Sequence, residues 1–315
     1  MGFLDIAAII LPVFGVVAVG YLARLTGLLG DDVGEALSKY VFTIAIPCLL
    51  FRIMADGNWP DISPWGYWVS YFAGIAVVWT ASSLIMTRLL KRDGPTGVVA
   101  GFTAGQSNTV LIGIPLILAV YGEAGAIPVV ALISIHLPIM MGVAAILMEL
   151  SDRSAADWRG TAKALARNIV LHPIILGIAI GAAWHALNLP TEGLLRPVLD
   201  SIAGTASTCA LFSLGLALRR YGVAGDLRAS LSVTALKVIV HPAIVLVLGV
   251  HVFQLPPVWL GAAMLFAASP SGINAYLVAG RYGTGMRISS SAIALSTAVA
   301  VVTVGLWLKI IPIPG

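Results

Sequence analysis

Residues 106–122 are the most informative stretch of the chain: Gln106-Ser-Asn-Thr-Val-Leu-Ile-Gly-Ile-Pro-Leu-Ile-Leu-Ala-Val-Tyr-Gly122. The stretch is apolar enough to lie inside a membrane, yet it contains Asn108, Gly113 and Pro115. Because proline removes a backbone donor and glycine loosens a helix, the sequence predicts a helix that is interrupted here. Interrupted backbone inside a bilayer is tolerated only where protein or a water-filled cavity covers it.

A second stretch of the same kind lies in the other half of the chain. Residues 269–274 read Ser269-Pro-Ser-Gly-Ile-Asn274, so Pro270 and Asn274 also lie within an apolar run. Corresponding interrupted helices in the two halves of a membrane protein are the best sequence indication of a transport site. An ordinary proline kink accounts for one such stretch, but less well for a matched pair that each carry an asparagine.

The composition of the whole chain agrees with a membrane location. Of 315 residues, 59% are hydrophobic and 10% are charged, and the mean hydropathy is +0.99. Soluble domains have about 45–50% apolar and about 25% charged residues. The composition therefore excludes a soluble globule, a disordered chain and a disulfide scaffold. The basic residues flank apolar runs, which indicates membrane topology rather than a nucleic-acid partner.

Apolar runs separated by charged and Gly/Pro-rich segments predict an all-α polytopic membrane protein with ten spans. No sustained alternation of apolar and polar residues indicates a β-barrel. The longest polar connection, residues 149–163, lies near the midpoint of the chain. The predicted spans are residues 4–23, 36–55, 65–89, 96–120, 125–148, 164–187, 197–218, 229–252, 257–280 and 287–311.

The distribution of lysine and arginine predicts the orientation. With the N-terminus outside, only Arg52, Arg196 and Lys309 of the 18 basic residues fall on the outer side, and Lys237 lies within a span. Because basic residues favour cytoplasmic loops, both termini are expected on the outer side of the cell (inner) membrane. Because each half has five spans, an odd number, the spans of the second half cross the membrane in the opposite sense to the corresponding spans of the first half. We therefore expect a 5+5 inverted repeat, with halves at residues 1–150 and 164–315.

Residues 106–122 closely resemble the fourth-span signature of the auxin efflux carrier family, which contains the plant PIN carriers and bacterial organic-anion carriers. Within this stretch, the block from Asn108 to Leu116 is the specific one. Further blocks agree with the family in the same order, so that the resemblance covers nearly the whole chain. These blocks are Tyr40–Phe51, Leu211–Leu218, Lys237–Pro242 and Ala268–Tyr282.

The resemblance implies the ten-helix fold of the bile-acid/sodium symporters. Spans 1, 2, 6 and 7 would form a scaffold and the surface of a homodimer. Spans 3–5 and 8–10 would form a mobile transport domain, in which spans 4 and 9 cross at their interruptions and carry substrate past the scaffold in an elevator-type cycle. The chain has His172-Pro173 where plant members have Asn-Pro. This histidine weakens the case for auxin itself as the substrate.

The predicted substrate site gathers around the two interruptions. The Asn108 amide can donate to a carboxylate, and helix ends freed by the interruption add backbone donors; hydrogen bonding between helices is the alternative role. Lys237 has no acidic residue at midspan to pair with, so a substrate carboxylate could be its counter-charge. The predicted substrate-binding residues are Asn108, Thr109, Gly113, Pro115, Lys237, Pro270, Ser271, Asn274 and His172.

His136, His172 and His241 all lie in predicted spans. Histidine titrates near neutrality and could couple protons, although hydrogen-bonded packing is its commoner role inside a span. The three are on separate spans without carboxylates nearby, so no metal site is predicted. No cofactor is predicted, and the ninth span has no Asp or Glu to support a sodium site.

These features predict a secondary transporter of small organic anions, either mono- or dicarboxylates or auxin-like aromatic carboxylates. The alternative is a channel or receptor without a carrier cycle. An enzyme is not expected, because His-Glu-x-x-His, Gly-x-Ser-x-Gly and paired midspan aspartates are missing from the sequence. The expected partners are the anion, the lipid bilayer and a second copy of the chain.

Overall fold

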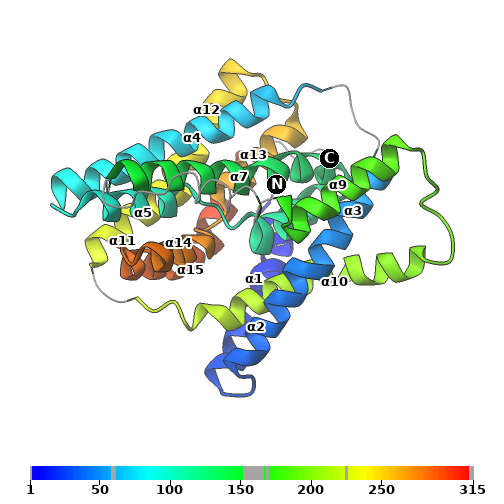
Figure 1. Ribbon diagram of the computed structural model, residues 1–315, viewed down its shortest axis with the longest axis horizontal. Helices are drawn as coiled ribbons and strands as arrows, with labels where there is room; N and C mark the ends of the chain where they lie inside the picture. The colour runs from blue at the N-terminus through cyan, green and yellow to red at the C-terminus, as the bar shows by residue number, and fades with distance from the viewer. Residues whose placement is uncertain (1, 58–61, 152–166, 168–169, 224–225, 312–315) are drawn as a thin grey trace.

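The computed structural model describes residues 2–57, 62–151, 167, 170–223 and 226–311, and its secondary structure is helical (Figure 1). Within these ranges, the β-structure is confined to an isolated antiparallel bridge between Ser107 and Ser271. The prediction of an all-α membrane protein is confirmed. Seven helical segments of the described residues are long and apolar enough to cross a membrane: Leu4–Leu25, Asp31–Asp56, Trp65–Leu89, Thr109–Ser151, Arg196–Leu218, Leu227–Val252 and Met286–Leu308.

The ten predicted spans and these seven segments differ for identifiable reasons. Thr109–Ser151 is 43 residues long and contains both the second part of predicted span 96–120 and all of span 125–148. Two other predicted spans are represented by the shorter apolar helices Pro173–Ala186 and Pro257–Ala268. Most of the predicted polar connection at 149–163, and the start of the predicted span at 164–187, lie outside the described residues.

The helices fall into two sequential sets. The first set is α1 (Phe3–Leu25), α2 (Asp31–Tyr40), α3 (Ile46–Asp56), α4 (Trp65–Leu84), α5 (Gly94–Gly105), α6 (Ile114–Tyr121) and α7 (Ala126–Ser151). The second set is α9 (Pro173–Ala186), α10 (Arg196–Leu218), α11 (Leu227–Ala235), α12 (His241–Val247), α13 (Pro257–Ala268), α14 (Asn274–Tyr282) and α15 (Met286–Leu308).

Short segments with wider or tighter turns connect several of these helices. Five are π-helical: η1 (Val41–Ala45), η2 (Ile85–Leu89), η3 (Thr109–Gly113), η5 (Leu236–Val240) and η6 (Leu248–Val252). One is a 3₁₀ turn, η4 (Gly122–Gly125), which joins α6 to α7. Because π-helical turns are rare and often mark functional sites, η3 and η5 direct attention to the residues around them.

Aspartates define the start of two helices at the polar connections. The Asp93 carboxylate accepts a hydrogen bond from Thr96 N at 2.7 Å and caps α5, and Asp226 accepts from Ala229 N at 3.2 Å and caps α11. Arg92 also donates to Asp226 at 2.9 Å, so the end of the α4–α5 connection is tied to the start of α11. The Arg92 guanidinium and the backbone donors of α11 hold the pKa of Asp226 below its usual range.

The helices pack in two groups that meet along η3 and α6. In one group α10 contacts α1, α2 and α3, and α3 contacts α9. In the other group α4 contacts α5, α12 and α13, while α15 contacts α11, α13 and α14. Figure 1 shows α2 at the bottom of the view, α3 above it to the right and α10 crossing them, whereas α4 and α5 lie in the upper left part of the view. The segment η3–α6 contacts α1 and α10 of the first group and α7 and α13 of the second.

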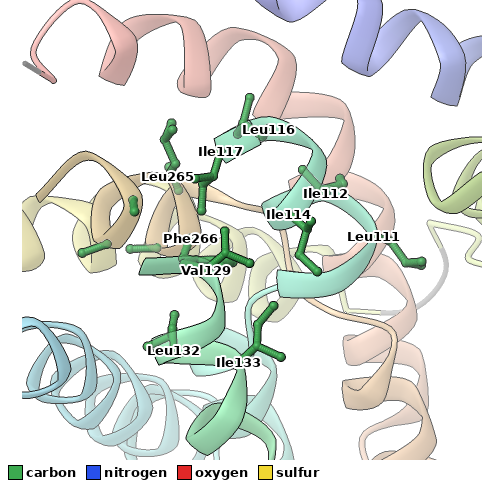
Figure 2. Packing of buried hydrophobic residues seen from close by; sticks show 14 of the residues in the cluster. Leu111, Ile112, Ile114, Leu116, Ile117, Val129, Leu132, Ile133, Leu265 and Phe266 are labelled. Carbon is green, nitrogen blue, oxygen red and sulfur yellow. The ribbon is translucent and has the colours of Figure 1, made fainter. Parts of the chain in front are cut away.

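Side chains of η3–α6 fill the buried core where the two groups meet. Figure 2 shows Leu111, Ile112, Ile114, Leu116 and Ile117 of this segment, Val129, Leu132 and Ile133 of α7, and Leu265 and Phe266 of α13, all of one buried cluster. A Cβ atom at Gly113 would lie 2.6 Å from Phe266 Cδ1. Gly113 is therefore required for the close approach of η3 to α13.

Small residues let α1 and α10 approach each other closely. A Cβ atom at Gly215 would lie 2.1 Å from Val17 O, and one at Gly20 would lie 2.3 Å from Phe212 O. In membranes, helix association depends on such close backbone packing, because lipid provides no hydrophobic driving force between helices.

We expect Gly215→Leu to destabilise the protein by about 1–3 kcal/mol or more, because the added side chain overpacks the contact between α1 and α10. Gly204→Leu is the matched control: Gly204 lies on the same helix, and a Cβ atom there would meet nothing within 4 Å. Thermal unfolding of the detergent-purified variants measures the difference. Equal losses of unfolding temperature in both variants would contradict the packing argument.

Candidate functional site

Two helix interruptions lie against each other near the centre of the protein. Helix α5 ends at Gly105 and η3 begins at Thr109; α13 ends at Ala268 and α14 begins at Asn274. Within the two interruptions, Ser107 and Ser271 pair in an antiparallel bridge. Helix termini from the two halves of the chain therefore converge on one place.

Backbone hydrogen bonds join the two interruptions. Asn108 N donates to Pro270 O at 2.8 Å, and Gly272 N donates to Gln106 O at 2.8 Å. Ser107 and Ser271 form the bridge between these bonds. Backbone groups that the helices leave without partners are thus satisfied across the contact, which is what an apolar environment requires.

The position of the first interruption differs from the expectation based on proline. The helix is interrupted at residues 106–108, whereas Pro115 lies at the start of α6, directly after η3. Gly113 N donates to Asn108 O at 3.0 Å, so the wider π-helical turn begins immediately after the interruption. A proline at the first positions of a helix does not disturb it, because its missing N–H would have no partner there. Pro270, in contrast, lies within the second interruption.

Asn108 is buried, and only one of the two polar atoms of its side-chain amide has a hydrogen-bond partner among the described residues. Its Oδ1 accepts a hydrogen bond from Leu111 N at 3.3 Å and so caps η3. Its Nδ2 has no hydrogen-bond partner among the described residues. A buried amide donor without a partner costs free energy, so Asn108 is held at the interruption with an unused donor.

Lys237 lies in η5 and connects the two interruptions. Its side chain is completely buried, and Nζ donates to Ser107 Oγ at 2.8 Å and to Ala267 O at the end of α13. Nζ is also 3.2 Å from His241 Nδ1, and the Tyr71 hydroxyl donates to Ser107 Oγ at 2.9 Å. The ammonium group thus interacts with the carbonyl end of a helix, where a cation is favourable. Among the described residues none of its partners is a carboxylate.

A cavity of about 310 Å³ lies beside the interruptions, between the two groups of helices. One wall is formed by α2, η1 and the start of α9, and the other by the first interruption, η3, α7 and the start of α14. Its apolar lining includes Phe42, Val110, Ile133 and Leu137. Its polar lining residues are Ser38, Lys39, Gln106, Thr109, His136, His172 and Asn274.

The structure brings three of the predicted substrate-binding residues to this cavity: Thr109, His172 and Asn274. The His172 ring also caps α9, because its Nδ1 accepts a hydrogen bond from Ile174 N at 3.4 Å. Asn108 and Pro270 lie behind this wall, where their backbones pair.

The other predicted residues surround the cavity without lining it. Ser271 is completely buried and does not line the cavity. Its hydroxyl donates a hydrogen bond to Thr103 O at 2.9 Å. Gly113 packs against Phe266, and Pro115 begins α6. Lys237 contacts Ser107 and Ala267 rather than the cavity, because π-helix η5 places it on the side of the interruptions next to α4 and α13. These residues shape the site from outside the cavity.

Two buried polar residues of the cavity, Gln106 and His136, were not among the predicted substrate ligands. The Gln106 side chain is 2% exposed, and its Oε1 has no partner among the described residues. The His136 side chain is also 2% exposed, and neither of its ring nitrogens has a hydrogen-bond partner among the described residues. Gln106 is the first residue of the stretch 106–122, and His136 is a polar residue within a predicted span. Both residues therefore stand out in the sequence as candidates for a site. The sequence could not show that they face the same cavity.

A second cavity, of about 690 Å³, is lined by an ion-pair network between α3 and α10. Arg196 bonds Asp56 at 2.8 Å and Asp200 at 2.9 Å, and Arg52 bonds Asp200 at 3.1 Å. Glu123 of η4 lies in the same lining. Because its cations are already paired with carboxylates, this cavity offers an anion less positive charge than its two arginines suggest.

The described ranges contain no group of three or more His, Cys, Asp or Glu residues that could hold a metal ion. Helices that are long and apolar enough to span a membrane, two joined interruptions and a cavity between two helix groups are features typical of membrane transporters. The chain belongs to the membrane transport protein family, whose sequence model matches residues 5–308 and which includes the auxin efflux carriers.

Relatives along the full length of the chain agree with this family. A "Putative malonate transporter" of Rhizobium meliloti (strain 1021) is 25% identical over 95% of this chain and 94% of its own length. "Uncharacterized transporter YfdV" of Escherichia coli O157:H7 is 24% identical over 96% of each chain. "Auxin efflux carrier component 8" of Arabidopsis thaliana is 22% identical over 93% of each chain.

Proposed function

We propose that the protein is a secondary carrier that moves small organic anions, mono- or dicarboxylates, across the membrane by an elevator-type alternating-access cycle. The observation that carries the proposal is the 310 Å³ cavity, which lies between two groups of helices and against two joined helix interruptions. A site enclosed between two packed bodies changes its access when one body moves past the other. The names of the Rhizobium meliloti and Arabidopsis thaliana relatives support an organic anion as the substrate.

The proposed architecture is a ten-span inverted repeat of residues 1–150 and 164–315. In it α1, α2–α3, α9 and α10 form the scaffold, and a homodimer forms through scaffold helices. Helices α4–α7 and α11–α15 form the transport domain, in which the two interrupted spans cross. The contacts that support this division are those of α10 with α1, α2 and α3, and those of α4 and α15 within the other group.

The proposed orientation places both termini on the outer side of the cell (inner) membrane, as the distribution of lysine and arginine indicates. Lys39 then lies toward the cytoplasm, and Arg52 and Arg196 lie toward the outside. Because Lys39 is exposed at the 310 Å³ cavity, this cavity opens to the cytoplasm, whereas the 690 Å³ cavity opens to the outside.

The proposed substrate site suits a small carboxylate. The cavity is at the lower end of the range of about 300–1,000 Å³ that ligand pockets occupy. Its described lining has one charged side chain, Lys39, and no Asp or Glu. Thr109 and Asn274 begin η3 and α14, so the positive ends of two helices point to the same region. Asn108 Nδ2 adds a donor from behind the wall.

The remaining predicted residues have supporting roles in this proposal. Gly113 and Pro115 let η3 and α6 pack closely after the first interruption. Pro270 and Ser271 hold the second interruption against the first. Lys237 fixes both interruptions through Ser107 and Ala267.

Counterflow in proteoliposomes tests the proposal. The purified protein is reconstituted with unlabelled malonate, malate, succinate, acetate or indole-3-acetate inside, and uptake of the same radiolabelled acid is measured. A carrier gives saturable uptake that internal substrate accelerates, whereas a channel gives no such acceleration. Absence of counterflow for every acid in the panel would overturn the proposed function.

A further inference from the structure

His136 is the most unusual polar residue of the 310 Å³ cavity. It lies on α7, its side chain is 2% exposed, and it lines the cavity. Neither Nδ1 nor Nε2 has a hydrogen-bond partner among the described residues. A neutral imidazole has one donor and one acceptor, and burying both without partners costs free energy. The ring is therefore placed where a ligand can satisfy it.

Aromatic side chains of α4 hold the His136 ring in place. Its centroid is 5.6 Å from that of Tyr71, in an edge arrangement, and 6.2 Å from that of Phe72, in a stacked arrangement. These contacts limit rotation of the ring without using its nitrogens. A ring that is held by packing alone keeps both nitrogens available to the cavity.

Within the part of the chain that the structure describes, the titratable groups that line the cavity or pack on the His136 ring include no carboxylate. On its own element, Ile133 and Leu137 are the other lining residues. Across the cavity, α2 contributes Lys39 and the start of α9 contributes His172. Behind the ring, α4 contributes Tyr71, whose ring is 5.0 Å from that of His241, and His241 is in turn 3.2 Å from Lys237 Nζ.

A carboxylate in this cavity has few sources of positive charge. Lys39 is exposed, so solvent and salt screen its charge. Lys237 already donates to Ser107 and Ala267. An anion that loses its hydration must be compensated by a nearby charge or by donors, and an opposite charge within a few ångströms favours the protonated form of an imidazole.

We propose that His136 binds one proton when a carboxylate occupies the cavity, so that proton and anion cross the membrane together. On entry, the neutral imidazole takes one proton from water and becomes an imidazolium beside the carboxylate. On the other side, the carboxylate leaves and the imidazolium returns the proton to water. On uptake one N–H bond forms as an O–H bond of the solvent donor (hydronium) breaks, and release reverses this exchange with no change of oxidation state. This inference rests on the proposed function and adds its coupling ion.

Proton uptake on binding tests the inference without requiring a complete transport cycle. Malonate, or the acid of the panel that gives counterflow, is titrated into the detergent-purified protein by calorimetry in two buffers of different ionisation enthalpy. The difference in heat gives the number of protons taken up per anion bound. We expect about one for the wild type. A value near zero with intact binding would overturn the inference and leave the proposed function standing.

Three variants assign the proton. His136→Gln is expected to lower proton uptake at least tenfold and to flatten the pH profile of counterflow. His172→Gln, which alters the other cavity histidine, is expected to retain proton uptake. His251→Gln is the matched control, because His251 is exposed on η6 and does not line the cavity.

The other outcomes are also decisive. Proton uptake that persists in His136→Gln would overturn the assignment, because the proton would then belong to the substrate or to another residue. If His136→Gln does not fold, loss of proton uptake in His172→Gln overturns the inference and retention supports it. If no acid of the panel binds or exchanges, the proposed function falls, and this inference falls with it.

Discussion

Replacing Lys237 by methionine or alanine is expected to reduce carboxylate transport about a hundredfold or more. Lys237 Nζ donates to Ser107 Oγ in the first interruption and to Ala267 O at the end of α13. A hydrogen bond from a charged group contributes about 1.5–3 kcal/mol, and its loss leaves a buried carbonyl with less compensation. Because about 1.4 kcal/mol corresponds to a factor of ten, loss of these bonds is sufficient for the expected effect.

The effect should fall on turnover more than on affinity, because Lys237 contacts the interruptions and does not line the cavity. Lys237→Met keeps the volume of the side chain and removes the charge, and Lys237→Arg retains the charge with a different geometry, so partial activity is expected. Lys309→Ala, at the exposed end of α15, is the control for loss of a basic residue.

Initial rates of counterflow and calorimetric affinities for the same acid separate the alternatives. Affinity that falls in proportion to the rate would mean that the Lys237 charge acts directly on the anion. Normal transport by Lys237→Met would show that the link between Ser107 and Ala267 is not needed for the cycle.

Asn108→Ala is expected to abolish transport and to weaken carboxylate binding about tenfold or more, while the protein is still produced. The substitution removes Oδ1, which caps η3 through Leu111 N, and Nδ2, the buried donor without a partner among the described residues. Loss of the cap alone costs about 1 kcal/mol. Loss of a donor to an ionised carboxylate costs about 1.5–3 kcal/mol.

Asn108→Asp separates the two roles of the side chain. Aspartate keeps the oxygen that caps η3, so any fall in its unfolding temperature reports the cost of the buried carboxylate and not the loss of the cap. It also replaces the donor by a second oxygen, which repels a carboxylate, so transport should still be lost. Asn188→Gly is the control, because Asn188 is exposed and has φ of 51°, a conformation that glycine adopts readily. Wild-type affinity in Asn108→Asp would remove the amide from the anion site.

Much of the fold could be predicted because its signals are local. Apolar runs long enough to cross a bilayer, and basic residues at their ends, arise from neighbouring residues and from the solvent around them. The interruption at Pro270 was also predictable, because proline and glycine act on the backbone where they stand. Pro115 shows the limit of the same rule, since the chain is interrupted at residues 106–108 and continues helically past Pro115.

The site could be predicted only in part. Thr109, Asn274 and His172 were chosen from two short stretches and one departure from a family pattern, and they line one cavity. Gln106 lies within the first of these stretches but was not assigned to the site. Membership of a cavity depends on which face of a helix is turned inward, and a span that is apolar on all sides does not show this.

The sequence by itself determined that the protein is a helical membrane transporter with two interrupted spans, because hydropathy and backbone chemistry act over a few residues. The tertiary structure alone decided which distant groups meet. Ser107 pairs with Ser271, Lys237 bonds Ser107 and Ala267, and His136 shares a cavity with His172. These partners are far apart in the chain, and the packing that places them depends on the close fit of whole helices, which no local pattern specifies.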